Sequence, residues 1–186
     1  SAINSSVCIN SMNSITSTNS RYDDFLSDTT VFSASEKRGF DLFTTDYNPF
    51  FPEESGADCQ HCHSGFNFEN DKYMNNGLDG EGQFADNGRE KATKNASDKA
   101  KFKVTSLRNI ALTAPYMHDG RFQSLEEVVE HYNSEIKASA TLDRALEQTR
   151  EKGLFLTEQD KTDLVAFLKT LTDKDLTTNS EYSSPF

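Results

Sequence analysis

The chain has 186 residues, of which 34% are hydrophobic and 26% are charged, and its formal net charge at pH 7 is −11. A chain of this length is typical of a single domain. The acidic balance argues against nucleic acid as a partner, because phosphate groups are bound by basic surfaces, and it favours a basic or neutral docking partner. No run of about 18 or more apolar residues occurs, so we expect no transmembrane segment.

Residues 1–19 are predicted to be a polar lead-in or linker. They are rich in Ser and Asn, and they lack both the basic start and the apolar stretch of a secretion signal. A weak helical pattern runs through Val7, Ile9, Met12 and Ile15. Cys8 has no evident partner, and we interpret it as a free thiol or as the partner of something outside the chain.

A capping-box signature at Ser33 and Glu36 predicts the next helix. In the capping box the side chains of the two residues bond each other's backbone amides, so the pattern marks where a helix begins. We expect this helix to carry Phe40 and Phe43 on one face. A proline-containing loop over residues 44–58 follows it.

Cys59, Cys62 and His63 form a C-x-x-C-H motif, which is the attachment motif of a c-type haem. Two thiols about one helical turn apart can add to the two vinyl groups of one haem, and the histidine that follows can then reach the iron as an axial ligand. The motif therefore predicts one covalently bound haem c. Since such attachment takes place outside the cytoplasm in bacteria, we expect a periplasmic or otherwise exported protein, present here as a mature or truncated chain.

Three other interpretations of the two cysteines fit less well. A structural zinc site would usually need a second Cys/His pair about 12 to 20 residues away, and Cys8 and His118 lie much farther off and are not paired. A thioredoxin-like redox pair would need a βαβ pattern, which is not visible. A disulfide between Cys59 and Cys62 would close a very small loop, stabilise little and leave His63 unexplained.

Residues 66–100 are rich in Asn, Asp, Gly and Lys and contain several turn signals, Asn76-Gly77, Asp79-Gly80 and Asn87-Gly88. We predict a surface excursion here, with a mostly disordered loop as the simpler interpretation. Residues 101–123 follow with neither a helical nor a strand period. Because this irregular segment carries Arg108, Met117 and His118, we interpret it as a wall of the cofactor site.

Two more helices are predicted toward the C-terminus. The first begins with a capping box at Ser124 and Glu127 and places four side chains on one face, Leu125, Val128, Val129 and Tyr132, with His131 off that face. The second begins at Thr157, with Asp160 three residues later. Its buried face draws on Leu164, Val165, Phe167, Leu168 and Leu171.

The rest of the pattern fixes the fold class. Residues 173–186 are polar and predicted to be a frayed tail. Because no strand-rich region occurs, we expect a mainly α fold, in which a cytochrome c-like helical domain with long loops surrounds one haem.

The sequence resembles a known family at this point. The segments FKVTSLRNIALTAPYMHDGRF (102–122) and LEEVVEHYN (125–133) are similar to the C-terminal haem domain of bacterial di-haem cytochrome c peroxidases and MauG-type enzymes. The C-x-x-C-H motif stands where that domain has it, and a weaker likeness extends over residues 20–172. The resemblance implies that residues 20–172 form a c-type haem domain.

The family relationship also implies a function and partners. In such enzymes this domain receives electrons from a small redox protein and passes them to a peroxide-reacting haem in an N-terminal domain of the same parent enzyme. This chain has one C-x-x-C-H motif, so we expect weak or absent peroxidase turnover from it alone. A free-standing monohaem cytochrome c is the alternative function, and a haem-bound sensor or interaction module is a third.

The iron ligands follow partly from the motif and partly from the resemblance. His63 is the proximal ligand by the motif. The candidates for the sixth ligand are Met12, Met74, Met117, His118, His131 and Tyr132. In the family this ligand is a Met or a Tyr at the position of Tyr132. A tyrosinate would lower the haem potential, whereas a Met such as Met117 would raise it.

The resemblance implies further contacts around the haem. Arg108 and His118 are expected to bind the haem propionates, and the planar guanidinium suits a carboxylate. The backbone carbonyls of Thr113 and Pro115 correspond to positions that bind calcium between the two domains of the peroxidases. The other domain's share of that site is not in this sequence, so the resemblance allows calcium as a second cofactor without requiring it.

Overall fold

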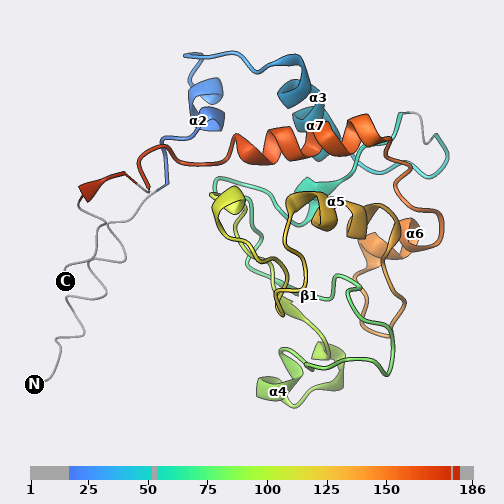
Figure 1. The fold of residues 1–186 in the computed structure, drawn as a ribbon. Helices are drawn as coiled ribbons and strands as arrows, with labels where there is room; N and C mark the ends of the chain where they lie inside the picture. The colour runs from blue at the N-terminus through green and yellow to red at the C-terminus, as the bar shows by residue number, and fades with distance from the viewer. Residues whose placement is uncertain (1–16, 52–53, 177, 181–186) are drawn as a thin grey trace, which may run out of the picture.

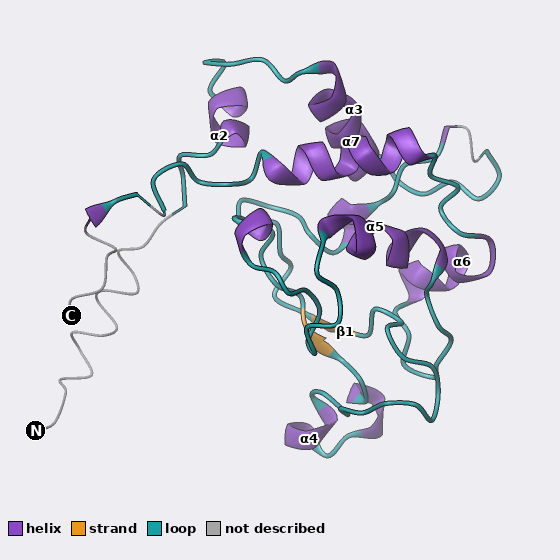
Figure 2. Cartoon of the chain, viewed as in Figure 1, coloured by secondary structure: helices purple, strands orange, loops and turns teal. Residues whose placement is uncertain are grey.

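The computed structural model describes residues 17–51, 54–176 and 178–180. Its α-helices are α2 (Arg21–Leu26), α3 (Ala34–Thr44), α4 (Glu90–Thr93), α5 (Leu125–Ser134), α6 (Arg144–Lys152) and α7 (Glu158–Lys169). Its 3₁₀ turns are η2 (Cys59–His61), η3 (Ala96–Asp98) and η4 (Ile110–Leu112), and its strands are β1 (Tyr73–Met74) and β2 (Phe102–Lys103). Long loops connect these elements (Figure 2). The prediction of a mainly α fold is confirmed.

The predicted helix starts are confirmed by the hydrogen bonds at each cap. Complete capping boxes precede α3 (Ser33), α5 (Ser124) and α7 (Thr157). A fourth box at Ser20 starts α2, and α6 begins after Asp143, whose side chain accepts from the amide of Ala145. Neither α2 nor α6 was predicted as a helix. The weak helical pattern of the lead-in, with Cys8 and Met12, lies outside the described residues.

Helix α7 lies between α3 and α5 and forms the centre of the fold (Figure 1). The ring of Phe167 on α7 is fully buried. Its centroid lies 5.1 Å from that of Phe43 and 5.4 Å from that of Phe40, both on α3. Tyr22 of α2 and Phe68 pack around the same ring, at 6.0 and 6.4 Å. Phe167 is thus the centre of an aromatic cluster that joins α2, α3 and α7.

Helices α3 and α7 cross in close contact at Gly39. A Cβ atom built on this residue would lie 1.9 Å from the backbone oxygen of Asp163, so only glycine allows this approach. The Asp163 side chain is fully buried at the same crossing. It accepts hydrogen bonds from Arg38 Nε at 2.7 Å, Gln159 Nε2 at 3.0 Å and the hydroxyl of Ser35. Burial alone would raise the pKa of Asp163, but the hydrogen bonds from Arg38, Ser35 and Gln159 outweigh it and lower the pKa.

Most of the predicted surface excursion over residues 66–100 is exposed or half-buried, but a few of its residues enter the core. Phe68, Asn75, Leu78 and Ala100 are buried, and β1 pairs with β2 in an antiparallel ladder. Some of its polar side chains form hydrogen bonds with the backbone of the segment and with side chains outside it. Asn75, for example, accepts from the amide of Gly77 at 2.9 Å and donates to two hydroxyl groups at 3.0 Å.

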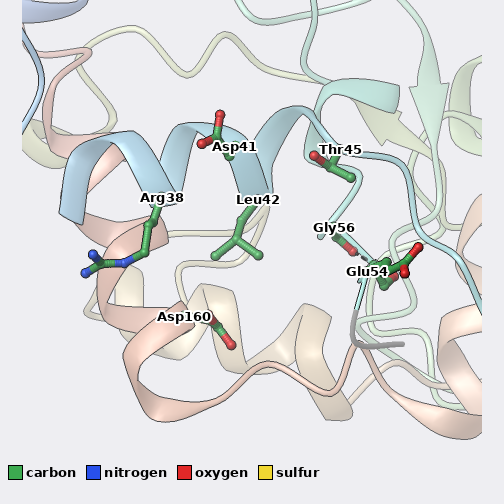
Figure 3. Close-up of a pocket in the computed structure, with 8 residues that line it drawn as sticks. Arg38, Asp41, Leu42, Thr45, Glu54, Gly56 and Asp160 are labelled. Atoms are coloured by element: carbon green, nitrogen blue, oxygen red, sulfur yellow. Dashed lines mark hydrogen bonds between the residues drawn. The ribbon is translucent and has the colours of Figure 1, made fainter. Parts of the chain in front are cut away.

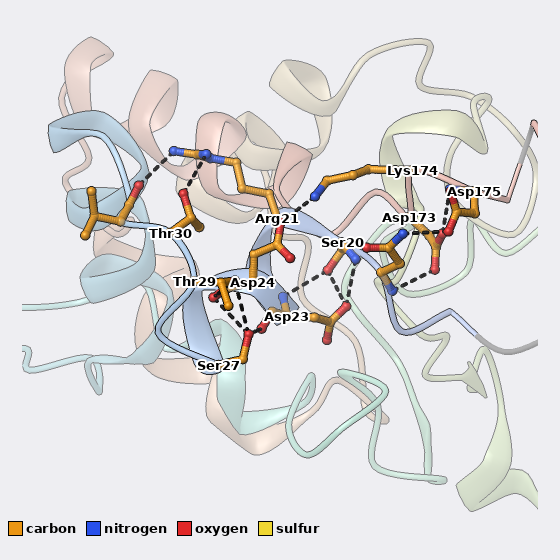
Figure 4. Close-up of polar contacts among 12 residues, drawn as sticks. Ser20, Arg21, Asp23, Asp24, Ser27, Thr29, Thr30, Asp173, Lys174 and Asp175 are labelled. Atoms are coloured by element: carbon orange, nitrogen blue, oxygen red, sulfur yellow. Dashed lines mark hydrogen bonds and ion pairs between the residues drawn. The ribbon is translucent and has the colours of Figure 1, made fainter.

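The expectation of a frayed C-terminal tail is also wrong for its first described residues. Asp173 is 4% exposed, and its carboxylate accepts from the amides of Thr18 and Asn19 at 2.9 and 3.0 Å. Its own amide donates to Asn109 Oδ1 at 2.7 Å. Ser20 and Asp173 also form an antiparallel bridge, and Figure 4 shows the two residues side by side. The two ends of the described chain are therefore fastened to each other.

No helix of the described residues is long and apolar enough to span a bilayer.

Replacing Gly39 by Ala should destabilise the fold. In an ordinary helix this change stabilises by about 1 kcal/mol, but here the new methyl group would overlap the Asp163 carbonyl. We expect the free energy of unfolding, measured by denaturant titration of the haem-loaded protein, to fall by about 1–3 kcal/mol. Gly80→Ala is the matched control, because its nearest neighbour is the flexible side chain of Gln83 at 3.1 Å. Equal stability of both variants would show that the helices do not touch at Gly39.

Candidate haem site

Both thiols of the C-x-x-C-H motif are presented by a single turn. Helix α3 ends at Thr44, and the backbone amide of Ala57 returns to the carbonyl of Leu42 at 2.8 Å. Asp58 then takes a left-handed conformation, φ 51°, and η2 begins at Cys59. The amides of Cys62 and His63 both donate to the carbonyl of Cys59, at 3.3 and 3.0 Å. This turn is why a spacing of three residues places the two side chains near each other.

The two cysteines are half-buried and not joined by a disulfide. Burial raises the pKa of Cys59 to about 12 and that of Cys62 to about 11. Redox and nucleophilic cysteines need a lowered pKa, because the thiolate is the reactive form. The environment of these thiols is therefore unlike that of a catalytic pair.

His63 is oriented by a backbone group, as metal-binding histidines commonly are. Its Nδ1 lies 3.0 Å from the carbonyl oxygen of Phe68. A carbonyl oxygen only accepts, so Nδ1 carries the proton and Nε2 is the nitrogen that would bind a metal. The backbone of Thr105 also forms a hydrogen bond with the ring. Burial lowers the pKa of His63, which favours the neutral, metal-binding form. The Phe68 ring is in the aromatic core, so the histidine is anchored to that core.

Tyr132 and Met117 meet at the side chain of Asn76. The Asn76 Nδ2 atom lies 3.3 Å from the Tyr132 hydroxyl and 3.3 Å from the Met117 sulfur. Burial raises the pKa of Tyr132 to about 12, against the hydrogen bond from Asn76, and the nearby Cys62 and Cys59 add to the rise. The phenol thus lies within electrostatic range of both thiols. The structure brings these two candidate ligands to the same part of the site as the haem motif.

The other candidate ligands have different surroundings. The sulfur of Met74 lies 3.4 Å from Cys62 Sγ. His131 is 2% exposed, and its Nε2 donates to the backbone oxygen of Asn76 at 3.0 Å. His118 is exposed and stacks on the ring of Phe102, with 3.7 Å between centroids. Met12 lies outside the described residues.

His131 was predicted to lie off the apolar face of its helix, and it is nevertheless buried. The loop around Asn76 covers that side of α5, so the helix is buried on more than its apolar face. The helical period reports only the apolar stripe, whereas His131 is buried by a polar contact to a residue 55 positions away.

Arg108 is held by groups of the protein itself. Its guanidinium makes a two-point ion pair with Asp23, both distances being 3.0 Å, and its Nε donates to the carbonyl of Phe66 at 2.9 Å. The side chain is 4% exposed and lies 4.2 Å from the Phe66 ring centroid. The guanidinium of Arg108 is therefore already paired with Asp23. The resemblance had implied that it contacts a haem propionate. That contact and the one of His118 stay predictions.

The expected calcium residues, Thr113 and Pro115, lie on an exposed turn after η4. The described residues contain no cluster of three or more His, Cys, Asp or Glu side chains that could hold a metal. Among the described residues, no such cluster of side chains accompanies the two carbonyls, and the calcium site stays a prediction.

A separate cleft of about 270 Å³ opens beside α3 and the start of α7. Figure 3 shows Arg38, Asp41, Glu54 and Asp160 around it. None of the residues of the haem motif lines this cleft. It is a charged surface feature and not part of the haem site.

Asn76 and Asp23 were missed by the sequence reasoning. Asn76-Gly77 was interpreted only as a turn signal, and Asp23 had no pattern that linked it to Arg108, which is 85 positions away. A signal did exist for Asn76, because it is a polar residue next to a glycine in a segment that precedes the cofactor wall. The sequence alone does not show which side chain of such a turn points inward.

A helical fold with a haem-attachment turn, an oriented histidine and candidate ligands near that turn defines the class of c-type cytochrome domains. No protein-family model matches the chain. The methylamine utilization protein MauG of Methylorubrum extorquens is 34% identical over 78% of this chain and 37% of its own length. Cytochrome c551 peroxidase of Nitrosomonas europaea is 33% identical over 82% of this chain and 39% of its own length.

Solved structures agree with these relatives. The crystal structure of a MauG-like protein associated with microbial copper homeostasis has a TM-score of 0.76 and 35% identity, covering 91% of this chain and 52% of that one. The diheme peroxidase BthA from Burkholderia thailandensis, at 23% identity and a TM-score of 0.62, shares the fold. The chain belongs to the family of MauG and the di-haem cytochrome c peroxidases, which implies haem c as its cofactor. It spans about two fifths of the length of these curated relatives.

Haem should be bound covalently through Cys59 and Cys62. We expect the intact mass to exceed that of the polypeptide by one haem, and acid-acetone to leave the haem on the protein, because two thioether bonds hold it. The single variants Cys59→Ser and Cys62→Ser each keep one attachment point. The double variant keeps none, so acid-acetone should extract its haem. Complete extraction of haem from the unaltered protein, or zinc in its place, would contradict the assignment.

Proposed function

We propose that this chain is the electron-transfer haem domain of a di-haem cytochrome c peroxidase or MauG-like oxidoreductase. Residues 20–172 form the domain, Cys59 and Cys62 carry one haem c, and His63 is the proximal ligand. The domain receives electrons and relays them to a peroxide-reacting haem in an N-terminal domain of the parent enzyme. Bound haem supplies a one-electron ferric/ferrous couple.

One observation supports this function above all. The site offers a protein donor for each axial position, since His63 is oriented by Phe68 and a phenol and a thioether lie together at Asn76. A haem with both axial positions filled by protein transfers electrons and leaves no open iron site for peroxide. The role of the chain's residues is then to hold the haem, set its potential and exclude water.

Tyr132 is the proposed sixth ligand. Its hydroxyl is carried by α5, a helix fixed by its capping box and by packing against α7. Its position is also the one that holds the ligand in the family. An anionic oxygen favours ferric iron and lowers the potential, whereas a thioether raises it.

The partners are proposed from the same relationship. They are the N-terminal haem domain of the parent enzyme and a small redox protein as electron donor, and the location is periplasmic or otherwise exported. Calcium bound by the carbonyls of Thr113 and Pro115 would lie where the two haem domains meet. Arg108 and His118 would serve the propionates, Arg108 only by sharing its guanidinium with Asp23.

A free-standing monohaem cytochrome c is the second candidate. The one C-x-x-C-H motif of these 186 residues is compatible with it. An upstream C-x-x-C-H motif in the parent gene would support the electron-transfer domain of a di-haem enzyme. Its absence, with efficient electron exchange between this chain and other redox proteins, would support the free carrier.

Peroxidase turnover by this chain alone should be weak or absent. With both axial positions filled, hydrogen peroxide has no site on the iron. The measurement is the rate of peroxide consumption by the purified ferric and ferrous holo-protein with an excess of a reduced small-molecule donor. Fast, saturable turnover would show that the haem is five-coordinate or that its sixth ligand is labile.

Replacing Tyr132 by Phe should change the haem, whereas Met117→Leu should change it little. Loss of the phenol oxygen should open the sixth position, shift the spin state and raise the midpoint potential, because the anionic donor to ferric iron is lost. Absorption spectra of both oxidation states and a redox titration measure this. If Met117→Leu alters the spectrum and Tyr132→Phe does not, the haem is instead a higher-potential His/Met carrier.

A further inference from the structure

Asn76 is placed between the two side chains that could bind the iron opposite His63. A side-chain amide has two N–H groups, so one nitrogen can donate to two acceptors at once. Asn76 Nδ2 lies 3.3 Å from both the Tyr132 hydroxyl and the Met117 sulfur. A single side chain thus connects the loop after the haem motif, the irregular segment before α5 and α5 itself.

The backbone around Asn76 is held independently of these contacts. His131, one residue before Tyr132, donates to the Asn76 carbonyl at 3.0 Å, and the Gly77 carbonyl accepts from the amide of Lys137 at 2.9 Å. Gly77 has φ +70°, and a Cβ there would lie 2.6 Å from Ile136 Cγ2. These contacts fix the loop against α5 and the segment after it. They do not involve the side chain of Asn76.

The side chain of Asn76 is not needed to form the turn. Its neighbour Asn75 accepts from the Gly77 amide and donates to Ser139 and Thr141, which completes the turn and fastens it. Met117, in addition, has a left-handed backbone, φ 71°. This conformation is rare for a side chain without a polar group near the backbone, and such strain tends to occur at functional sites. The Met117 sulfur lies 3.3 Å from Asn76 Nδ2 in this conformation.

We propose that Asn76 is the positioning residue of the sixth-ligand side of the haem: its amide fixes the Tyr132 oxygen and, by donating a hydrogen bond to it, sets the potential of the haem. The inference rests on the proposed function, in which Tyr132 binds the iron. Hydrogen bonds from residues behind the first ligands orient those ligands and tune the metal. A donor to an anionic oxygen withdraws electron density from it, so the oxygen stabilises ferric iron less. Asn76 therefore raises the potential above that of an unassisted tyrosinate.

The test is a redox titration of the haem-loaded Asn76→Leu variant with ferric absorption and electron paramagnetic resonance spectra. We expect a negative shift of the midpoint potential, equivalent to about a tenfold change in the ferric-to-ferrous stability ratio, or about 59 mV for one electron. Asn76→Gln, which keeps the amide, should recover part of the shift. Asn95→Leu is the matched control, since Asn95 is exposed and caps η3 far from the motif. Asn76→Ala replaces Asn76→Leu where the latter does not fold.

The double variants separate this inference from the choice of ligand. If Tyr132 binds the iron, Asn76→Leu should cause no further shift in the Tyr132→Phe protein but keep its effect in Met117→Leu. If the effect instead disappears only in Met117→Leu, the proposed sixth ligand is wrong while Asn76 still acts on the ligand. An unchanged potential and spectrum in both Asn76→Leu and Asn76→Ala, with normal haem content, overturns the role of Asn76.

Discussion

The close crossing of α3 and α7 at Gly39 is the constraint on which the rest of the molecule depends. Because no Cβ separates the helices there, the ring of Phe167 reaches both Phe40 and Phe43. The buried carboxylate of Asp163 is tolerated at the crossing because Arg38, Ser35 and Gln159 satisfy it. The amide of Ala57 bonds the carbonyl of Leu42 on α3 at 2.8 Å, which ties the C-x-x-C-H turn to this helix.

Phe68 connects this core to the haem site. Its ring packs against Phe43 and Phe167, while its carbonyl oxygen orients His63. Core packing and the direction of the His63 ring are therefore set by the same residue. The opposite side of the site is built differently, since α5 and the loop at Asn76 are joined by polar contacts. In the proposed haem site, the hydrophobic core thus holds His63, and a hydrogen-bonded wall holds Tyr132.

The molecule also shows how acidic residues are used in a chain of net charge −11. Burial alone would raise the pKa of Asp23, but hydrogen bonds from Arg108 and Ser20 outweigh it and lower the pKa. Asp173 is likewise buried and accepts backbone amides from the segment before α2. These carboxylates stay ionised inside the fold because each is bonded to donors. Part of the charge therefore serves to fasten segments and not to attract a partner.

The sequence by itself determined what depends on near neighbours in the chain. The capping boxes at Ser33, Ser124 and Thr157 and the C-x-x-C-H turn each join residues three or four positions apart, so their geometry follows from local backbone rules. The mainly α class and the family resemblance rest on the same local patterns.

Only the tertiary structure decided the features that join distant residues. The pairing of Arg108 with Asp23, the burial of His131 against the Asn76 carbonyl and the meeting of Tyr132 with Met117 at one amide join residues 41 to 85 positions apart. The close contact of Gly39 with Asp163 spans a still longer stretch of chain. A pattern of hydropathy carries no information about which polar groups satisfy each other across such separations, because that choice depends on how the helices are packed.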